Sequence, residues 1–388
     1  INLIVRGTLI MNILILSAST GGGHMRASKA IENYMIQQGE NINVEIVDSL
    51  LYISPILNKT ITSGYLYLAT KTPKLYGKLY DLTNKEHKLA NFVARLNNIF
   101  ANKLMPLIED FKPDVIITTH PFPTEMVSRL KVKGEINIPL ICIMTDYAPH
   151  KAWISKDIDA YIVSNDDMVG KMVNEGVNLK NIYSYGIPID EVFFKEEEKQ
   201  LVIEELGFDK NLPTILMMAG SFGVNNVFDV YENIIDIDLD FQIILVTGKN
   251  QKLYNNFEKI VEDSPKKTKL IYFTDEINKY MQASDIIITK PGGLTVTEAL
   301  ACNIPMAVFD AIPGQEEENA EFLLKHNMAV RIKDGQSCRQ SIIELLNDED
   351  KLEGMKAACK SFDKNDSSKN IFLLINELIE NNKLLSDE

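Results

Sequence analysis

The stretch "NILILSASTGGGHMRASKAIENYM", residues 12–35, joins an apolar run, a glycine-rich turn and a helical pattern. Residues 12–17 have the continuous apolar character of a strand that is buried on both faces. From Ala27 to Met35 the apolar side chains recur at spacings of three and four, which predicts an amphipathic helix. A strand, a glycine turn and a helix in this order predict the start of a doubly wound α/β domain.

The same alternation of strand and helix patterns continues along the chain. Apolar runs predict nine further parallel strands, which are residues 44–48, 114–119, 139–145, 160–164, 214–220, 241–248, 269–273, 285–290 and 305–309. The pattern pauses at "EEEKQ" (196–200), which is a candidate hinge. We therefore predict two doubly wound domains, residues 11–192 and 200–365, and a C-terminal helix within 366–388. The sequence leaves open whether this helix packs back on the first domain.

Composition limits the class of protein. The chain has 388 residues, of which 45% are hydrophobic and 24% charged, as in an ordinary globular protein. Its net charge of −14 argues against nonspecific binding to nucleic acid. The first ten residues, "INLIVRGTLI", are not followed by a small-residue cleavage site, so we interpret them as an extension rather than a signal peptide. The four cysteines are far apart and form no metal-binding pair, which favours reduced thiols in the cytoplasm.

The glycine turn at 21–23 is a candidate phosphate cradle. Arg26 stands where a dinucleotide fingerprint needs its third glycine, although Asp48 lies about where a ribose-binding acid would be. A Walker loop is excluded because no Gly-Lys-Ser/Thr follows. Gly22 and Gly23 would let the backbone approach an anion at the helix start. His24 suits proton transfer, and the alternative is a histidine that only caps the helix.

A second glycine loop, "MAGSFGVNN" (218–226), follows the first strand of the second domain. There Ser221 offers a hydroxyl and Gly223 permits a close approach of the backbone. Because ligands bind beyond the carboxyl ends of the strands in such sheets, we expect both loops at one active site in a cleft between the domains. The alternative is that each loop is only a strand-to-helix turn.

The most specific stretch is "DIIITKPGGLTVTEALACNIPMAVFDAIPGQEEENAEFLL", residues 285–324. A strand ends at Lys290, and the amides of Gly292–Thr295 at the next helix start could hold a phosphate. Glu298 could accept both hydroxyls of a ribose. Gln315 and Glu316 begin a further helix and suit the vicinal hydroxyls of a hexose. The alternative is that these acids belong to solvated helix starts.

Positive charge is concentrated in residues 52–105, which contain eight basic residues, only two acidic residues and five tyrosines. Anionic headgroups attract lysine and arginine, and tyrosine favours the membrane interface. We predict peripheral binding to an anionic membrane surface, with Lys71, Lys74, Tyr76 and Lys78 as contacts. The alternative is a solvated helical face with core tyrosines.

Taken together, "STGGGH" and "KPGGLTVTEAL…GQEEENA" resemble the glycosyltransferase family of bacterial diacylglycerol glucosyltransferases and plant monogalactosyldiacylglycerol synthases. The likeness runs from about residue 11 to 325 and includes "MTDYAPHKAW" (144–153) and "YGIPI" (185–189). This resemblance, which is to glycosyltransferase family 28, implies a GT-B fold, in which two Rossmann-like domains share a cleft. It also implies a UDP-sugar donor, held mainly by the second domain, and diacylglycerol as the acceptor.

The resemblance assigns roles to individual positions. The catalytic base would be His24, with Asp146 in reserve, and Asp146, His150 and Trp153 would lie near the acceptor entrance. Phe273 and Thr274 would lie by the uracil. The residues expected to bind the UDP-sugar are Gly22, Gly23, Ser221, Gly223, Phe273, Thr274, Gly292, Gly293, Leu294, Thr295, Glu298, Gln315 and Glu316.

The reaction implied is a single inverting displacement that transfers a hexose and gives a β-glycosyl-diacylglycerol at the inner face of the cell membrane. UDP-glucose is favoured over UDP-galactose, and we expect no cofactor and no obligatory metal. Three alternatives stay open. They are transfer of N-acetylglucosamine to a polyprenyl-linked or soluble acceptor, epimerisation of UDP-N-acetylglucosamine at C2, and a non-catalytic nucleotide-sugar sensor.

Overall fold

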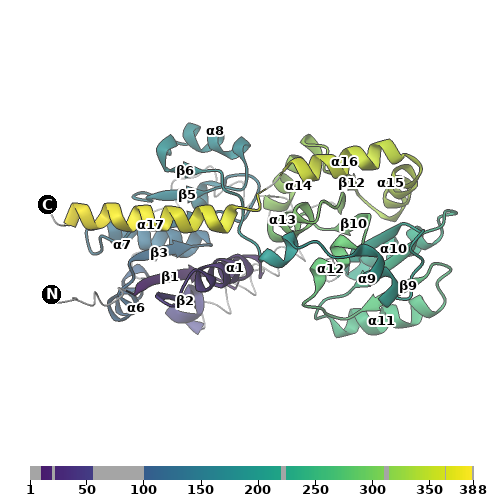
Figure 1. Cartoon of the computed structure of the whole chain (residues 1–388), viewed down its shortest axis with the longest axis horizontal. Coiled ribbons are helices and arrows are strands. Elements are labelled where there is room, and N and C mark those ends of the chain that lie inside the picture. Colours follow the sequence, from purple (N-terminus) through teal and green to yellow (C-terminus); the bar gives the residue numbers. More distant parts are fainter. Residues whose placement is uncertain are drawn as a thin grey trace, which may run out of the picture. The chain divides into compact units, whose positions relative to one another are not determined.

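The computed structural model describes residues 10–19, 22–55, 100–219, 224–309, 314–362 and 364–386. They form two compact units: unit 1 comprises Ile1–Glu191 and Lys364–Glu388, and unit 2 comprises Val192–Asp363. Each unit contains a six-stranded sheet whose strands all pair in parallel. Helices cover both faces of each sheet (Figure 1). This is the predicted pair of doubly wound α/β domains.

The sheet of unit 1 has the strand order β2-β1-β3-β4-β5-β6. Its elements, in chain order, are β1 (Met11–Ser17), α1 (Gly23–Gln37), β2 (Ile42–Asp48), α2 (Ser49–Ile53), α6 (Met105–Phe111), β3 (Val115–Thr118), α7 (Pro121–Val132), β4 (Leu140–Ile143), the short helix η1 (Lys151–Trp153), β5 (Ala160–Ile162), α8 (Asp166–Asn174), the short helix η2 (Leu179–Asn181), β6 (Ile182–Tyr183) and α17 (Ser367–Ser386).

Alternating side chains of β1 supply two separate cores in unit 1. Ile13 and Ile15 pack under α1 and α17, whereas Leu14 and Leu16 pack under α6, α7 and α8. These four side chains are fully buried. Such two-sided burial explains why the strand reads as a continuous apolar run rather than as an alternating one.

The sheet of unit 2 has the order β12-β11-β10-β7-β8-β9. Its elements are α9 (Lys199–Glu205), β7 (Thr214–Met218), α10 (Val224–Ile235), β8 (Gln242–Val246), α11 (Gln251–Glu262), β9 (Thr268–Ile271), α12 (Ile277–Gln282), β10 (Ile286–Thr289), α13 (Gly293–Ala301), β11 (Met306–Phe309), α14 (Gln315–Lys325), β12 (Ala329–Ile332), α15 (Gly335–Asn347) and α16 (Glu349–Ser361); a short helix, η3 (Glu191–Phe194), begins at the boundary with unit 1.

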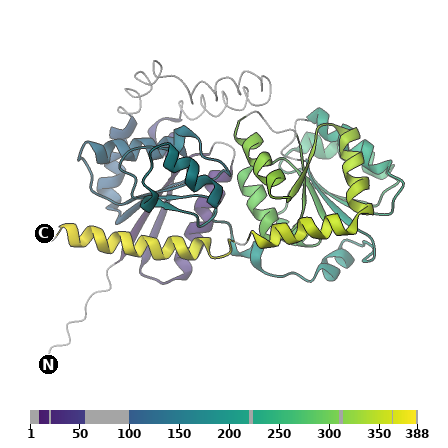
Figure 2. The same ribbon diagram turned by 90° about the horizontal axis from the view of Figure 1, so that it is seen from above.

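The C-terminal helix α17 belongs to unit 1 although it follows unit 2 in the sequence. Ile371, Leu374 and Ile375 are buried in the core that α1 and β1 form. Figure 2 shows α17, in yellow, along one side of unit 1. The start of the helix is fixed to the loop after β6, because the Ser367 hydroxyl donates to the Gly186 carbonyl at 2.9 Å.

The candidate hinge at 196–200 lies inside unit 2, and the chain crosses between the units at 191/192 and 363/364. The Gln282 side chain holds this segment, since its amide nitrogen donates to the carbonyls of Phe193 and Lys195 and its oxygen accepts from the Glu197 amide. Two edge strands, β6 and β12, have no counterpart among the ten predicted from the sequence. Their apolar signal is weak because β6 has only two residues and β12 has Arg331 among its four.

Candidate functional site

The candidate site in unit 1 lies where the strand order reverses. The chain passes from β1 outward to β2 and then returns to β3 on the other side of β1. The helices after β1 and β3 therefore lie on opposite faces, and a space opens beyond the carboxyl ends of these two strands. Its first wall is the start of α1, where Gly22 is the N-cap with φ of 76°. This left-handed conformation explains the glycine at that position.

His24 lies in the first turn of α1 and contacts the ends of two other strands. Its Nδ1 is 2.7 Å from the carbonyl oxygen of Thr119, after β3, and 2.9 Å from the hydroxyl of Thr145, after β4. A carbonyl oxygen only accepts hydrogen bonds, so these partners assign the proton to Nδ1. Both bonds that the described residues make with the ring use Nδ1, which leaves the lone pair on Nε2.

The surroundings of His24 keep it neutral. Burial lowers the pKa of His24 to about 4, against the smaller opposite effect of the hydrogen bond to Thr119. The ring of His120 lies edge-on, with the centroids 4.7 Å apart, and the fully buried Trp153 lies 6.1 Å away. A neutral imidazole with a free Nε2 can accept a proton from a hydroxyl.

Hydroxyl groups fix the backbone below this histidine. The Thr119 hydroxyl donates to Ser17 at 2.8 Å and lies 2.9 Å from the Ser28 hydroxyl, which in turn donates to the His24 carbonyl. Ser17, Ser28 and Thr119 are fully buried. Buried hydroxyls that satisfy one another hold the start of α1 against the ends of β1 and β3.

Of the other predicted residues of unit 1, Asp146, His150 and Trp153 lie in the segment after β4. Asp146 follows Thr145, and its main-chain carbonyl accepts from the Ser164 hydroxyl at 2.8 Å. The Nδ1 of His150 accepts from the Ala152 amide, which makes His150 the N-cap of η1. Asp48, considered above as a ribose-binding acid, instead caps α2.

In unit 2 the strand order reverses between β7 and β10. The "PGG" turn after β10 leads into α13, whose N-cap Gly292 has no side-chain cap. A Cβ at Gly292 would meet no atom of the described residues within 4 Å. Asn319 of α14 is buried and donates to the Pro291 carbonyl at 3.0 Å, which fixes the turn. The first amides of α13, those of Gly293, Leu294 and Thr295, are therefore the ones that an anion could bind.

Glu298 is in the second turn of α13 and is 3% exposed. A solvated helix start does not explain this position, because burying a carboxylate costs free energy unless a partner compensates it. Gln315 and Glu316 begin α14, whose N-cap Gly314 also has no side-chain cap. Both residues are partly buried, and they follow β11, the neighbour of β10.

Phe273 and Thr274 follow β9 at the edge of the same sheet. The Phe273 side chain is exposed, and the Lys249 ammonium lies 4.4 Å from its ring centroid. The Thr274 hydroxyl accepts from the Glu276 amide and so closes a turn before α12. The two strands between β9 and β10 make the span between them roughly 14 Å, at about 4.8 Å per strand. The strand before Phe273 and the strand before the helix of Glu298 are thus not neighbours in the sheet.

Six predicted residues lie outside the described part of the chain: Ser221, Gly223, Lys71, Lys74, Tyr76 and Lys78. Other site residues emerge only in the structure, namely Thr119, His120, Thr145, Lys249 and Asn319. "TTH" at 118–120 stands at the carboxyl end of a predicted strand, which is the signal that could have drawn attention to His120.

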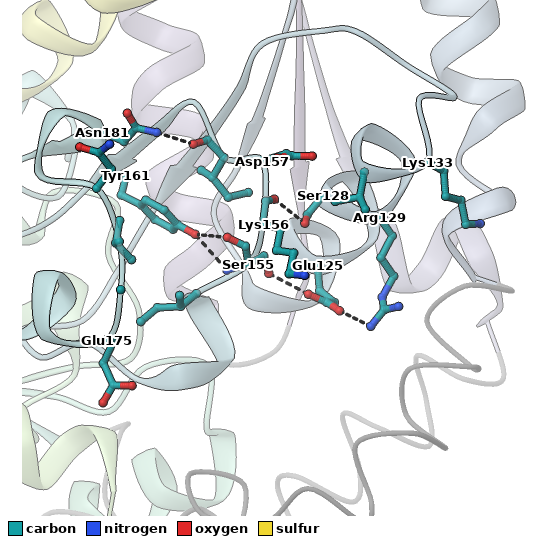
Figure 3. A pocket seen from close by; sticks show the side chains of 16 residues that line it. Glu125, Ser128, Arg129, Lys133, Ser155, Lys156, Asp157, Tyr161, Glu175 and Asn181 are labelled. Atoms are coloured by element: carbon teal, nitrogen blue, oxygen red, sulfur yellow. Dashed lines mark hydrogen bonds and ion pairs between the residues drawn. The ribbon is translucent and has the colours of Figure 1, made fainter.

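A pocket of about 890 Å³ opens elsewhere in unit 1, between α7, the segment after η1 and the end of α8. Figure 3 shows Glu125 between Ser155 and Arg129, and the Tyr161 hydroxyl on the backbone of Ser155. None of the predicted site residues that the structure describes lines this pocket. The loops on its rim precede β5 and β6, so it lies toward the amino ends of the strands, away from His24.

Among the described residues, no helix combines the length and apolar character that crossing a membrane requires. The same residues contain no cluster of three or more His, Cys, Asp or Glu side chains arranged to hold a metal ion.

Two family models match the chain, the first within unit 1 and the second along unit 2 and into the start of α17. Residues 24–189 match the model of monogalactosyldiacylglycerol (MGDG) synthase, and residues 214–371 match the glycosyltransferase family 28 C-terminal domain. A processive diacylglycerol beta-glucosyltransferase of Bacillus pumilus (strain SAFR-032) is 34% identical over 380 residues, which are 96% of this chain and 97% of the relative. The enzyme of the same name from Bacillus thuringiensis (strain Al Hakam) is 32% identical over 90% of this chain and 89% of the relative.

Solved structures share the fold at low sequence identity. MurG of Acinetobacter baumannii covers 95% of this chain and 99% of its own, with a TM-score of 0.66 and 14% identity. S. aureus MnaA in complex with UDP covers 93% of this chain and 95% of its own, with a TM-score of 0.62 and 15% identity. At this identity the likeness establishes the GT-B fold, with its two Rossmann-like domains, as expected from the sequence.

Proposed function

We propose the function of this chain from one premise: the chain belongs to the glycosyltransferase family of the monogalactosyldiacylglycerol synthases and the processive diacylglycerol β-glucosyltransferases. It transfers glucose from UDP-glucose to diacylglycerol and forms a β-glucosyl-diacylglycerol. The observation that carries this proposal is the 34% identity to a diacylglycerol β-glucosyltransferase along nearly the whole of both chains. The name of this relative supports glucose over galactose as the donor sugar.

The reaction is one displacement at the anomeric carbon. The acceptor hydroxyl attacks from the face opposite UDP, so the new C–O bond forms while the bond to UDP breaks, and the configuration inverts. The hydroxyl proton goes to Nε2 of His24, whose Nδ1–H stays on the Thr119 carbonyl. The Thr119 carbonyl stabilises the His24 imidazolium that forms, by accepting the hydrogen bond from Nδ1–H. This carbonyl is itself uncharged.

Unit 2 binds the donor. The uncapped amides of Gly293, Leu294 and Thr295 accept the diphosphate and stabilise the charge that develops on UDP as it leaves. Glu298 accepts the ribose hydroxyls, and the exposed ring of Phe273 lies by the uracil. Gln315 and Glu316 bind the sugar hydroxyls, and Ser221 and Gly223 complete the diphosphate site.

We further propose that transfer needs no metal, because helix-start amides can supply the stabilisation of the leaving group. UDP release should therefore persist in excess EDTA. A loss of activity in EDTA that magnesium restores would contradict this part of the proposal.

The acceptor is a membrane lipid, so the enzyme acts as a peripheral protein at the inner face of the cell membrane. The basic, tyrosine-rich segment with Lys71, Lys74, Tyr76 and Lys78 supplies the contact with anionic headgroups. Neutralising the three lysines together should weaken sedimentation with anionic liposomes. Unchanged sedimentation would show that other residues bind the membrane.

The decisive experiment measures UDP release from UDP-glucose with anionic liposomes, with and without diacylglycerol. We expect release only when diacylglycerol is present, and the anomeric proton coupling of the product should show the β configuration. Substitution of UDP-galactose tests the choice of sugar. If UDP were released from UDP-N-acetylglucosamine but from neither UDP-hexose, transfer of N-acetylglucosamine would be favoured. The appearance of the C2 epimer of UDP-N-acetylglucosamine would favour epimerisation.

A further inference from the structure

We propose that His120 is a positioning residue that holds His24 in the tautomer and ring orientation in which Nε2 is the free base. The inference rests on the proposed function, since it concerns the base of that reaction. It assigns His120 a role that is distinct from its visible one, which is to cap α7.

The orientation of the His24 ring decides whether the base is available. If the ring turned by 180° about its Cβ–Cγ bond, carbon Cδ2 would replace Nδ1 at the carbonyl of Thr119 and the hydroxyl of Thr145. Both hydrogen bonds of Nδ1, which are now 2.7 Å and 2.9 Å long, would be lost. The rotation would also change the direction of Nε2, so proton transfer to Nε2 depends on preventing it.

His120 is placed to prevent it. Its ring meets that of His24 at 81°, with the centroids 4.7 Å apart, which is an edge-to-face contact. The ring of His120 is itself fixed, because its Nδ1 accepts from the Phe122 amide at 3.1 Å. Thr119 and His120 are adjacent in the chain, so one turn of backbone supplies both the carbonyl and the ring that confine His24.

The charge state of His120 suits this role. Burial, with a charge on His24 acting in the same direction, holds the pKa of His120 well below its usual value. His120 therefore stays neutral when His24 receives the proton, and it does not compete as a base. Trp153, at 6.1 Å and tilted by 55°, is a further aromatic neighbour of the His24 ring.

Two substitutions separate positioning from capping. His120→Asn keeps an acceptor that caps a helix well but removes the ring. His120→Phe keeps an aromatic ring but removes the acceptor. We expect His120→Asn to lower kcat by about 10-fold or more with the KM for UDP-glucose unchanged, and to leave Tm nearly unchanged. His120→Phe should keep kcat within about threefold and lower Tm by about 2–4 °C.

The second readout is the tautomer of His24, measured from its ¹⁵N chemical shifts in protein labelled at histidine and without substrates. Wild type should show the proton on Nδ1, and His120→Asn should show a mixture of tautomers. A His120→Asn variant with wild-type kcat and an unchanged tautomer would overturn the proposal, and so would an equal loss of kcat in both variants. If wild type transferred no glucose to diacylglycerol, the proposed function would fail, whereas the tautomer in His120→Asn would still decide the positioning role.

Discussion

The switch point of unit 1 lies between β1 and β3, whereas that of unit 2 lies between β7 and β10. At the first, a titratable ring is held by a carbonyl, a hydroxyl and two aromatic neighbours. At the second, a glycine turn leads into a helix without a side-chain cap, and a carboxylate lies buried in the second turn of that helix. In the proposed function, the same topology thus serves proton transfer in one unit and the binding of an anion and hydroxyls in the other.

The contrast shows how little of the chemistry the doubly wound fold dictates. Both sheets deliver loops to the carboxyl ends of neighbouring strands, and the residues that stand there decide what the site does. If the division is correct, substitutions in unit 1 should affect turnover, and substitutions in unit 2 should affect donor binding.

Replacement of His24 by Ala is the most severe test. We expect kcat to fall by about 10²–10⁴-fold, the range for loss of a general base. The Kd of UDP, measured by calorimetry, should stay within about threefold of wild type, since the proposed contacts of the diphosphate and ribose are mainly in unit 2. A large loss of UDP affinity in His24→Ala would break the division between the units.

The pH dependence follows from the lowered pKa of His24. In the folded protein the His24 imidazole is protonated only near pH 4, whereas a histidine in the unfolded chain is protonated near pH 6.5. The folding stability that neutral His24 contributes is therefore complete above about pH 6.5 and is lost as the pH falls through about 4. Because His24 is partly exposed, this loss of folding free energy is at most about 3 kcal/mol. Urea unfolding at several pH values should show this loss, and His24→Ala should reduce it.

The same pKa predicts the acid limb of the pH–rate profile. Activity per mole of folded enzyme should stay level from about pH 8 to 5.5 and fall only toward pH 4. An inflection near pH 6.5 that disappears in His24→Ala would show that the base is solvated, contrary to the geometry.

Glu298→Gln tests the site in unit 2 with a side chain of the same shape. Loss of a charged hydrogen-bond partner costs about 1.5–3 kcal/mol, so the Kd of UDP-glucose should rise by about 10–150-fold. The acid limb near pH 4 should remain where it is. A shift of that limb in Glu298→Gln would mean that Glu298 takes part in proton transfer.

The smallest effect compares two glycines that are both helix N-caps. Gly22 has φ of 76° and Gly292 has φ of −72°, and an added Cβ would meet no atom at either position. Gly22→Ala should lower the free energy of unfolding by about 1–2 kcal/mol because only it forces a left-handed alanine. Gly292→Ala should stay within about 0.5 kcal/mol of wild type, because a weaker cap and a less flexible unfolded chain act in opposite directions. Equal losses would show that cap preference, and not φ, decides.

The sequence predicts the order of elements well because a buried parallel strand has a strong local pattern. Runs such as 12–17 and 285–290 are apolar on both faces, and this pattern does not depend on distant residues. The two-residue β6 and the edge strand β12 are too short or too polar for such a pattern. The family is confirmed, since motifs such as "KPGGLTVTEAL" are long enough to be specific.

The partners of His24 could not be predicted in the same way. Thr119 is 95 residues away along the chain and Thr145 is 121 residues away. Both become its neighbours only because β3 pairs with β1 and β4 with β3. The contact of Asn319 with the Pro291 carbonyl likewise depends on the position of α14 against the turn before α13. Residue types at strand ends are visible in a sequence, whereas the contacts among them are set by strand order.

The position of α17 has a consequence for biosynthesis. The core under α1 is closed by Ile371, Leu374 and Ile375, whereas the strands that it covers end at Tyr183. At about 5–20 residues per second, a ribosome needs on the order of 10–40 s to synthesise the chain between these points. During that interval one apolar face of unit 1 lacks its cover, while unit 2 is synthesised without interruption and can fold first. A nascent chain halted before residue 367 should therefore expose the face that α17 covers to chaperones and proteases, and synthesis of α17 completes the fold of unit 1.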